Sequence, residues 1–136
     1  MIVVLNFGSQ VAHLLARRVR DMGVRAEVVG FDTSAGEIRK LDPAGIILSG
    51  SPASVLEKES PRPDREVFAL GIPVLGVCYG HQVVAQMLGG KVKKGKQREF
   101  GKETLFVKNL VKKKTGIFKG LGTKETVWFS HGDQAV

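Results

Sequence analysis

The chemistry of this chain is concentrated around its single cysteine, Cys78. An apolar run of strand length, residues 72–77, leads into Gly-x-Cys-x-Gly and then into a helical pattern. Strand, tight turn and helix in this order are typical of a nucleophile elbow, here with cysteine in place of serine. The turn places Cys78 at a helix N-terminus, where the helix dipole and free N–H groups favour a thiolate. The pattern therefore favours a cysteine nucleophile over the ordinary alternative of a small buried apolar residue.

The residues around this turn predict how an oxyanion would be stabilised. Gly76 and Gly80 flank the cysteine, and glycine permits backbone angles and a helix–strand approach that a side chain would block. A thiolate that attacks a carboxamide carbon generates an oxyanion, which needs N–H donors beside the nucleophile. The amide of Tyr79 is placed for one donor because it directly follows the nucleophile. The turn at Gly50 and Ser51, at the end of another expected strand, can supply the second.

The three histidines are weaker candidates for catalysis. His13 is expected on the surface of a helix, and His81 follows the cysteine by three residues. A general base needs hydrogen-bond reach and an orienting partner, and the sequence identifies no such partner for His81. Three scattered histidines with one cysteine also make a poor metal site, so we expect no metal.

Alternating strands and helices must position these residues. We expect strands at 2–7, 26–31, 45–48 and 72–77, and helices at 10–22, 35–41, 65–70 and 79–88. Ser9 and Ser34 are the expected N-caps of the first two helices, and Leu14 is expected on the apolar face of the first. Four strand–helix repeats predict an α/β fold with an open, mostly parallel sheet and helices on both faces. The loops after strands one, three and four should meet at the carboxyl edge, where such sheets place their sites.

The pattern changes after residue 90. Two-residue alternation predicts strands at 91–96, 103–107 and 125–130, joined by turns. A turn or a single helical turn is expected at 116–122, and the last strand should end in a Gly-Asp turn at 132–133. A lysine-rich loop is expected at 112–114.

Composition and length favour a soluble, globular protein. At 136 residues the chain has the size of one domain, and 43% hydrophobic and 25% charged residues are ordinary values for that class. No apolar run reaches membrane-spanning length, and the first residues predict a strand and not a signal peptide. One cysteine cannot form an internal disulfide, which suits a reducing compartment. We therefore expect a cytoplasmic protein without a membrane partner.

The net charge of +8 comes from the last third of the chain. Residues 1–90 carry nine basic and nine acidic side chains, whereas residues 91–136 carry twelve basic and four acidic ones. A basic surface can attract nucleic acid, an anionic substrate or an acidic partner protein. No aromatic residues interleave with these lysines as they do on single-strand binding platforms. We therefore favour a solvated face and keep nucleic-acid binding as an alternative that salt-dependent retention on DNA would support.

Residues 76–82 resemble the Gly-x-Cys-x-Gly-x-Gln signature of class I glutamine amidotransferases. Further stretches resemble the amidotransferase part of the GMP synthase branch of this family: residues 6–10, 16–20, 45–50, 98–101 and 127–133. The resemblance spans essentially the whole chain. It implies a single amidotransferase domain over residues 1–136, incomplete at its C-terminus.

The resemblance assigns roles to individual residues. Cys78 would attack the side-chain amide of L-glutamine, forming a glutamyl thioester and releasing ammonia, with the amides of Tyr79 and Ser51 as oxyanion donors. Gln82 would help to bind the glutamine. The substrate's amino and carboxylate groups would be held by a loop of four residues, Ser130, His131, Gly132 and Asp133.

The resemblance also implies a partner. Ammonia would pass to an ATP-pyrophosphatase domain or subunit that converts XMP to GMP. No phosphate loop with glycine and lysine occurs in this sequence, so ATP and magnesium are expected only on the partner and no cofactor on this domain.

The sequence departs from the family pattern at three places. The usual Gly-Gly-Pro turn has Ser51 as its middle residue, and Asn6 stands where aspartate is common. The family's base is a His-Pro-Glu segment downstream of Ser-His-Gly-Asp, and these 136 residues contain no such segment. A catalytically silent glutamine-binding or regulatory homologue therefore stays open as an alternative, as does another class I branch.

Overall fold

The structure, a computed structural model, describes residues 1–107 and 116–135, with side chains left out at 96–100, 129–132 and 134. The chain divides into two compact units. The first comprises residues 1–94 together with the end of the chain from Asp133, and the second comprises residues 95–132. Each unit is described by itself.

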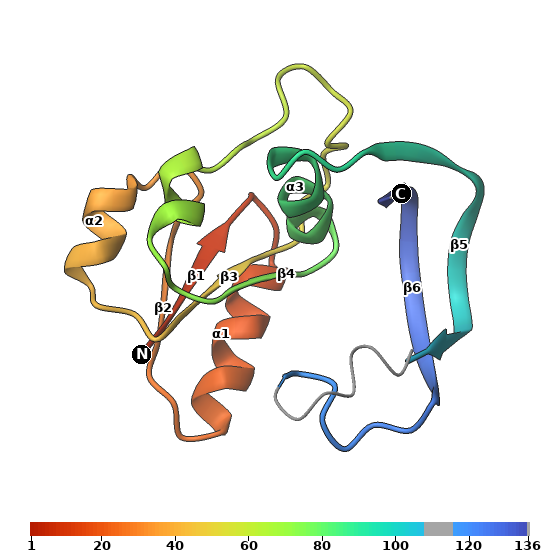
Figure 1. Cartoon of the computed structure of the whole chain (residues 1–136), viewed down its shortest axis with the longest axis horizontal. Coiled ribbons are helices and arrows are strands. Elements are labelled where there is room, and N and C mark those ends of the chain that lie inside the picture. Colours follow the sequence, from red (N-terminus) through yellow and green to blue (C-terminus); the bar gives the residue numbers. More distant parts are fainter. Residues whose placement is uncertain (108–115, 136) are drawn as a thin grey trace. The chain divides into compact units, whose positions relative to one another are not determined.

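The first unit is built on a four-stranded parallel sheet with the strand order β2-β1-β3-β4 (Figure 1). The strands are β1 (Ile2–Asn6), β2 (Ala26–Gly30), β3 (Gly45–Leu48) and β4 (Val74–Gly76). In the register Leu5 pairs with Leu48, and Leu48 pairs with Gly76. The segments that follow β1, β3 and β4 therefore emerge side by side at one edge of the sheet, as the sequence predicted.

Helices cover both faces of this sheet (Figure 1). They are α1 (Val11–Asp21), α2 (Ala35–Lys40), α3 (Tyr79–Met87) and the 3-10 helix η1 (Arg65–Ala69). Alternate residues of a strand point to opposite faces, so Val4 packs with α1 while Val3 and Leu5 pack with α2, η1 and α3. The predicted open parallel sheet with two covered faces is confirmed.

The first helix is buried through two alanines as well as through Val19, and one of the large residues that the sequence pattern indicated lies outside the core. Ala12 and Ala16 are fully buried, whereas Leu14 is 59% exposed. Because alanine is short, α1 can lie close against the sheet, and Leu14 is left on its outer side. The expectation for Leu14 was therefore wrong.

The two predicted helix caps have different outcomes. Ser34 caps α2 as expected: its hydroxyl accepts from the Glu37 amide, and the Glu37 carboxylate accepts from the Ser34 amide at 3.1 Å. The Ser34 hydroxyl also donates to the Glu37 carboxylate at 2.6 Å, and this bond, together with the one from the Ser34 amide, holds the pKa of Glu37 below its usual value. In α1 the N-cap is Gln10, one residue later than expected, and the hydroxyl of Ser9 accepts from the amide of Val11 at 3.3 Å.

The second unit contains a two-stranded sheet formed by β5 (Val92–Phe106) and β6 (Lys124–Ala135), both of which begin or end in the first unit. β5 joins the strands predicted at 91–96 and 103–107 into one, with Gly101 at a φ of +115° between them. β5 pairs with β6, and strand pairing is a tertiary contact that the local alternation pattern does not contain. β6 also continues through residues 130–133, so the predicted turn there was wrong.

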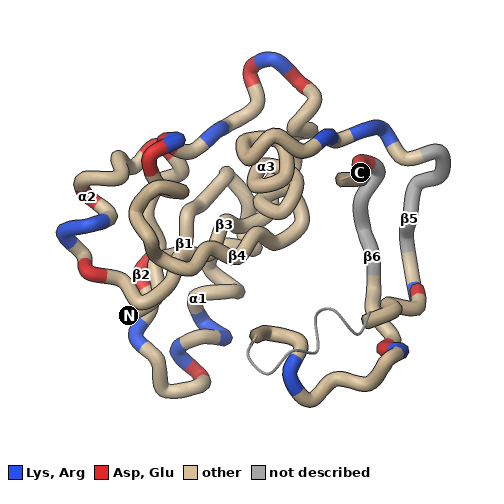
Figure 2. Tube along the Cα trace, viewed as in Figure 1, with Lys and Arg blue, Asp and Glu red and all other residues tan. Residues whose placement is uncertain are grey.

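The structure also bears on the predicted turns and on the distribution of charge. The turn predicted at 116–122 is confirmed at residues 116–120, and the loop predicted at 112–114 lies outside the described residues. Figure 2 shows both signs of charge interspersed along the first unit, and Lys91, Lys93 and Lys94 are all exposed. None of the helices in the part of the chain that is described is long and apolar enough to cross a membrane.

Candidate active site

Cys78 occupies a backbone conformation that residues with a side chain rarely adopt. It lies between the end of β4 and the first residue of α3, with φ +51° and ψ −114°, and it is exposed. Such strain persists only where the surrounding structure holds it, and it is concentrated at functional sites. The amide of Val77 donates to the carbonyl of Leu48 at 2.9 Å, and the amide of Gly80 donates to that of Ser49 at 3.1 Å. Both sides of the cysteine are thereby tied to the end of β3.

The two glycines beside the cysteine are required by close packing. A Cβ atom on Gly76 would lie 2.5 Å from the backbone nitrogen of His81, and one on Gly80 would lie 2.2 Å from the carbonyl oxygen of Leu48. Real Cβ atoms do not approach backbone atoms so closely, so any side chain would push α3 away from β3 and β4. The sequence expectation that these glycines permit a close helix–strand approach is confirmed.

The predicted oxyanion turn lies directly beside the nucleophile. A Cβ atom on Gly50 would be 3.8 Å from the Cβ of Cys78, an ordinary van der Waals contact. Tyr79 starts α3, so its amide has no partner within that helix. Within the described residues, no hydrogen bond is found from the amide of Tyr79 or from that of Ser51. The amide that follows the nucleophile and the amide that follows Gly50 are therefore both available as donors.

Tyr79 itself is held by its side chain. Its ring is 3% exposed and packs against the ring of Phe7, with the centroids 5.5 Å apart. Its hydroxyl donates to the carbonyl of Pro61 at 2.5 Å. Burial raises the pKa of Tyr79, because the ionised phenolate would be poorly solvated there. The residue after the nucleophile thus anchors the start of α3 both in the apolar core and to the loop that precedes η1.

Two of the residues predicted to bind glutamine meet in the structure. The buried side chain of Gln82 donates from Nε2 to the backbone carbonyl of Asp133 at 2.9 Å. The carboxylate of Asp133 accepts from the hydroxyl of Ser54 at 2.5 Å. The side-chain amide of Gln82 is therefore engaged with the segment that contains Asp133. This contact joins the first helical turn of α3 to the end of the chain.

The other three residues of that predicted set lie in β6. The side chains of Ser130, His131 and Gly132 fall outside the described residues, so their roles stay predictions. His81 is exposed on α3, and His13 is exposed on α1 as predicted. Among the described residues, no group of three His, Cys, Asp or Glu side chains is placed to hold a metal ion.

Comparison with known proteins shows which family this chain belongs to. The sequence profile of the family "glutamine amidotransferase class-I" matches residues 3–136. This chain belongs to the class I glutamine amidotransferase family.

Curated relatives of this family member are GMP synthases described as glutamine-hydrolysing. The chain is 47% identical over 133 residues to that of Caldanaerobacter subterraneus subsp. tengcongensis, covering 98% of this chain and 25% of the relative. It is 49% identical over 135 residues to that of Vibrio parahaemolyticus, covering 99% and 25%. The chain spans about a quarter of the length of these relatives.

Solved structures support the fold of this chain. A Thermoplasma acidophilum protein, described as a candidate GMP synthase subunit, superposes with a TM-score of 0.77 at 28% identity, over 99% of this chain and 66% of that one. A glutamine amidotransferase from Methylobacillus flagellatus superposes with a TM-score of 0.68 at 18% identity, over 100% of this chain and 56% of that one. The second similarity concerns the fold alone.

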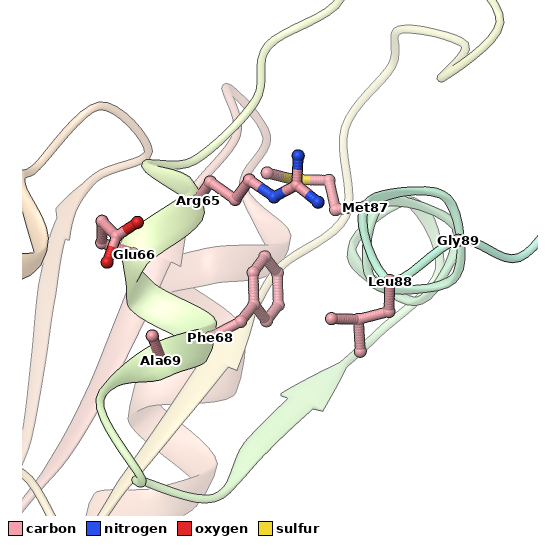
Figure 3. Close-up of a pocket in the computed structure, with 7 residues that line it drawn as sticks. All are labelled: Arg65, Glu66, Phe68, Ala69, Met87, Leu88 and Gly89. Atoms are coloured by element: carbon pink, nitrogen blue, oxygen red, sulfur yellow. The ribbon is translucent and has the colours of Figure 1, made fainter.

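A hollow of about 420 Å³ lies elsewhere in the first unit, between η1 and the end of α3 (Figure 3). Phe68 of η1 points toward Leu88, and Arg65 extends toward Met87. Cys78 is at the opposite end of α3, and a nine-residue helix is about 13 Å long. None of the residues that line the hollow was predicted to bind glutamine, so it is separate from the nucleophile.

Several hydroxyls around the nucleophile were missed as site residues by sequence reasoning. Ser9 and Ser49 donate to the carbonyl of Gly50, which lies beside Cys78, and Ser54 donates to Asp133, one of the residues predicted to bind glutamine. The sequence predicts Ser9 as a helix cap in the loop after the first strand, and it places Ser49 directly after the third expected strand. Serine is common at both kinds of position, so its presence there gave no signal of a further role.

Proposed function

We propose that this chain hydrolyses L-glutamine to glutamate and ammonia through a thioester on Cys78. The proposal rests on the strained turn that exposes the sulfur beside Gly50 and Ser51 at the carboxyl edge of the sheet. In the first step the thiolate bonds to the side-chain carbonyl carbon, and the oxyanion accepts from the amides of Tyr79 and Ser51. The carbon–nitrogen bond then breaks, and the nitrogen leaves as ammonia after gaining a proton. Water adds to the thioester, which releases glutamate and restores the thiol.

We further propose that the ammonia serves the conversion of XMP to GMP. The identity of 46–49% to glutamine-hydrolysing GMP synthases, over nearly all of this chain, favours this branch over other class I amidotransferases. The partner is then an ATP-pyrophosphatase domain or subunit in the cytoplasm, and ATP and magnesium bind to that partner. Gln82 and residues 130–133 are proposed to form the glutamine site on this chain.

The test is glutamate release from L-glutamine by this chain, measured beside Cys78→Ala. We expect release by the natural sequence and none by the variant, since alanine offers no nucleophile. Calorimetry with glutamine should show binding to both proteins, because the substitution leaves the rest of the site intact. Binding without release by the natural sequence would favour the alternative of a catalytically silent glutamine-binding homologue. An absence of binding to both would contradict the proposal.

A further inference from the structure

The carbonyl oxygen of Gly50 is the meeting point of two seryl hydroxyls. It accepts from Oγ of Ser9 at 2.9 Å and from Oγ of Ser49 at 3.2 Å. Gly50 and Ser49 are both buried, and Ser9, at the start of α1, lies 41 positions away in the sequence. A single carbonyl is therefore held by two hydroxyls, one from the residue next to it, just after β3, and one from the segment that precedes α1.

Each hydroxyl is oriented by a backbone amide. Oγ of Ser9 accepts from the amide of Val11 at 3.3 Å, and Oγ of Ser49 accepts from the amide of Phe7 at 3.3 Å. A seryl hydroxyl has one proton to donate, so an amide on its acceptor side directs that proton to the remaining partner. In both residues the remaining partner is the carbonyl of Gly50.

Holding this carbonyl also sets the direction of the next amide. A trans peptide is planar, and its C=O and N–H point in opposite directions. The carbonyl of Gly50 and the N–H of Ser51 belong to the same peptide unit. This N–H is the second donor proposed for the oxyanion. On the far side of the turn, Oγ of Ser51 accepts from the amide of Ala53 at 3.2 Å. The peptide is thus held before and after the donor.

We propose that Ser9 is a positioning residue that directs the Ser51 amide toward the oxyanion formed at Cys78. The inference rests on the proposed glutamine hydrolysis and adds to it a residue from the start of α1. Rotation of the Gly50–Ser51 peptide would remove its buried carbonyl from both hydroxyls, which is costly for an unsatisfied polar group. Ser9 therefore keeps the donor in place before the substrate arrives, which is what oxyanion stabilisation requires.

The test compares two reactions of Cys78 in Ser9→Ala. Glutamine hydrolysis passes through an oxyanion, whereas alkylation by iodoacetamide displaces iodide at a methylene carbon and forms none. We expect kcat for glutamate release to fall about tenfold with KM for glutamine unchanged, since the donor acts in the transition state. The rate of alkylation should stay the same. Ser9→Thr, which keeps the hydroxyl, should restore kcat.

Ser34→Ala is the matched control, because it removes one seryl hydroxyl from the cap of α2, on the other face of the sheet from α1. It should leave both reactions unchanged. An unchanged kcat in Ser9→Ala would overturn the inference, and so would an equal fall in hydrolysis and alkylation, which would mean that Ser9 supports the cysteine turn as a whole. If Ser9→Ala does not fold, Ser9→Gly, which also lacks the hydroxyl and adds no second thiol, is measured in its place. A natural sequence that binds no glutamine and releases no glutamate would contradict the proposed function, and this inference with it.

Discussion

The two ends of α3 differ in how tightly they are packed and in what they can do. At the N-terminal end, Gly76 and Gly80 let the helix approach the strands so closely that no side chain fits, and Cys78 is held in a strained conformation. At the C-terminal end, Leu88 is 65% exposed and borders a hollow of about 420 Å³. We place the proposed chemistry at the crowded end, since a nucleophile and its donors must be held in place.

The largest effect is expected from adding one methyl group at the crowded end. Gly80→Ala places a Cβ 2.2 Å from the carbonyl oxygen of Leu48, and we expect a loss of about 3 kcal/mol or more in the free energy of unfolding. Gly89→Ala at the other end meets no atom within 4 Å and should cost about 1 kcal/mol, from its φ of +90° alone. Denaturant unfolding of both variants measures the difference. Equal losses would mean that the two ends are packed alike.

Relieving the backbone strain at Cys78 should increase the free energy of unfolding, by less than Gly80→Ala lowers it. Cys78→Gly removes the penalty of φ +51°, whereas Cys78→Ala keeps a Cβ and therefore the strain. We expect the glycine variant to be more stable than the alanine variant by about 1 kcal/mol, after the conformational entropy of glycine is subtracted. Thermal unfolding of the pair checks this, and a glycine variant that is the less stable of the two would contradict it.

Tyr79, the residue after the nucleophile, should make the free energy of unfolding depend on pH in the alkaline range. Burial raises the pKa of Tyr79 above its ordinary value near 10, so the folded state favours the protonated phenol. The free energy of unfolding should therefore be independent of this group below pH 10 and fall as the pH rises above it. Tyr79→Phe keeps the ring but loses the hydrogen bond to Pro61, at a cost of about 1 kcal/mol at neutral pH.

The Tyr79→Phe variant should also show a weaker fall in stability above pH 10 than the natural sequence. The measurement is urea unfolding from pH 7 to pH 11 for both proteins. Identical alkaline slopes would show that Tyr79 does not titrate differently in the folded and unfolded chains.

The smallest effect is expected at the open end of the helix. Leu88→Ala removes a side chain that is 65% exposed, so the free energy of unfolding should change by less than about 0.5 kcal/mol. Glutamate release should be unchanged, because Leu88 lies at the far end of α3 from Cys78. A marked loss of activity would mean that the hollow takes part in the reaction.

Local patterns in the sequence were sufficient for the elements of the first unit. Strand β3 was predicted with its observed bounds, and the Ser34 cap of α2 is present as predicted. Propensity and capping act over a few residues, so they can be recognised without the fold. Patterning failed where pairing decided the outcome: β5 runs through the predicted break near Gly101, and β6 runs through the predicted Gly-Asp turn.

The candidate site divides in the same way. The sequence by itself determined the turn that carries Cys78, its flanking glycines and the amide of Tyr79, because all of these lie within a few residues of one another. Only the tertiary structure decided that Ser9 binds the carbonyl of Gly50 and that Gln82 and Ser54 both bind Asp133. These partners are between 41 and 79 positions apart, and hydrogen bonds over such separations depend on strand order and register, which no local pattern contains.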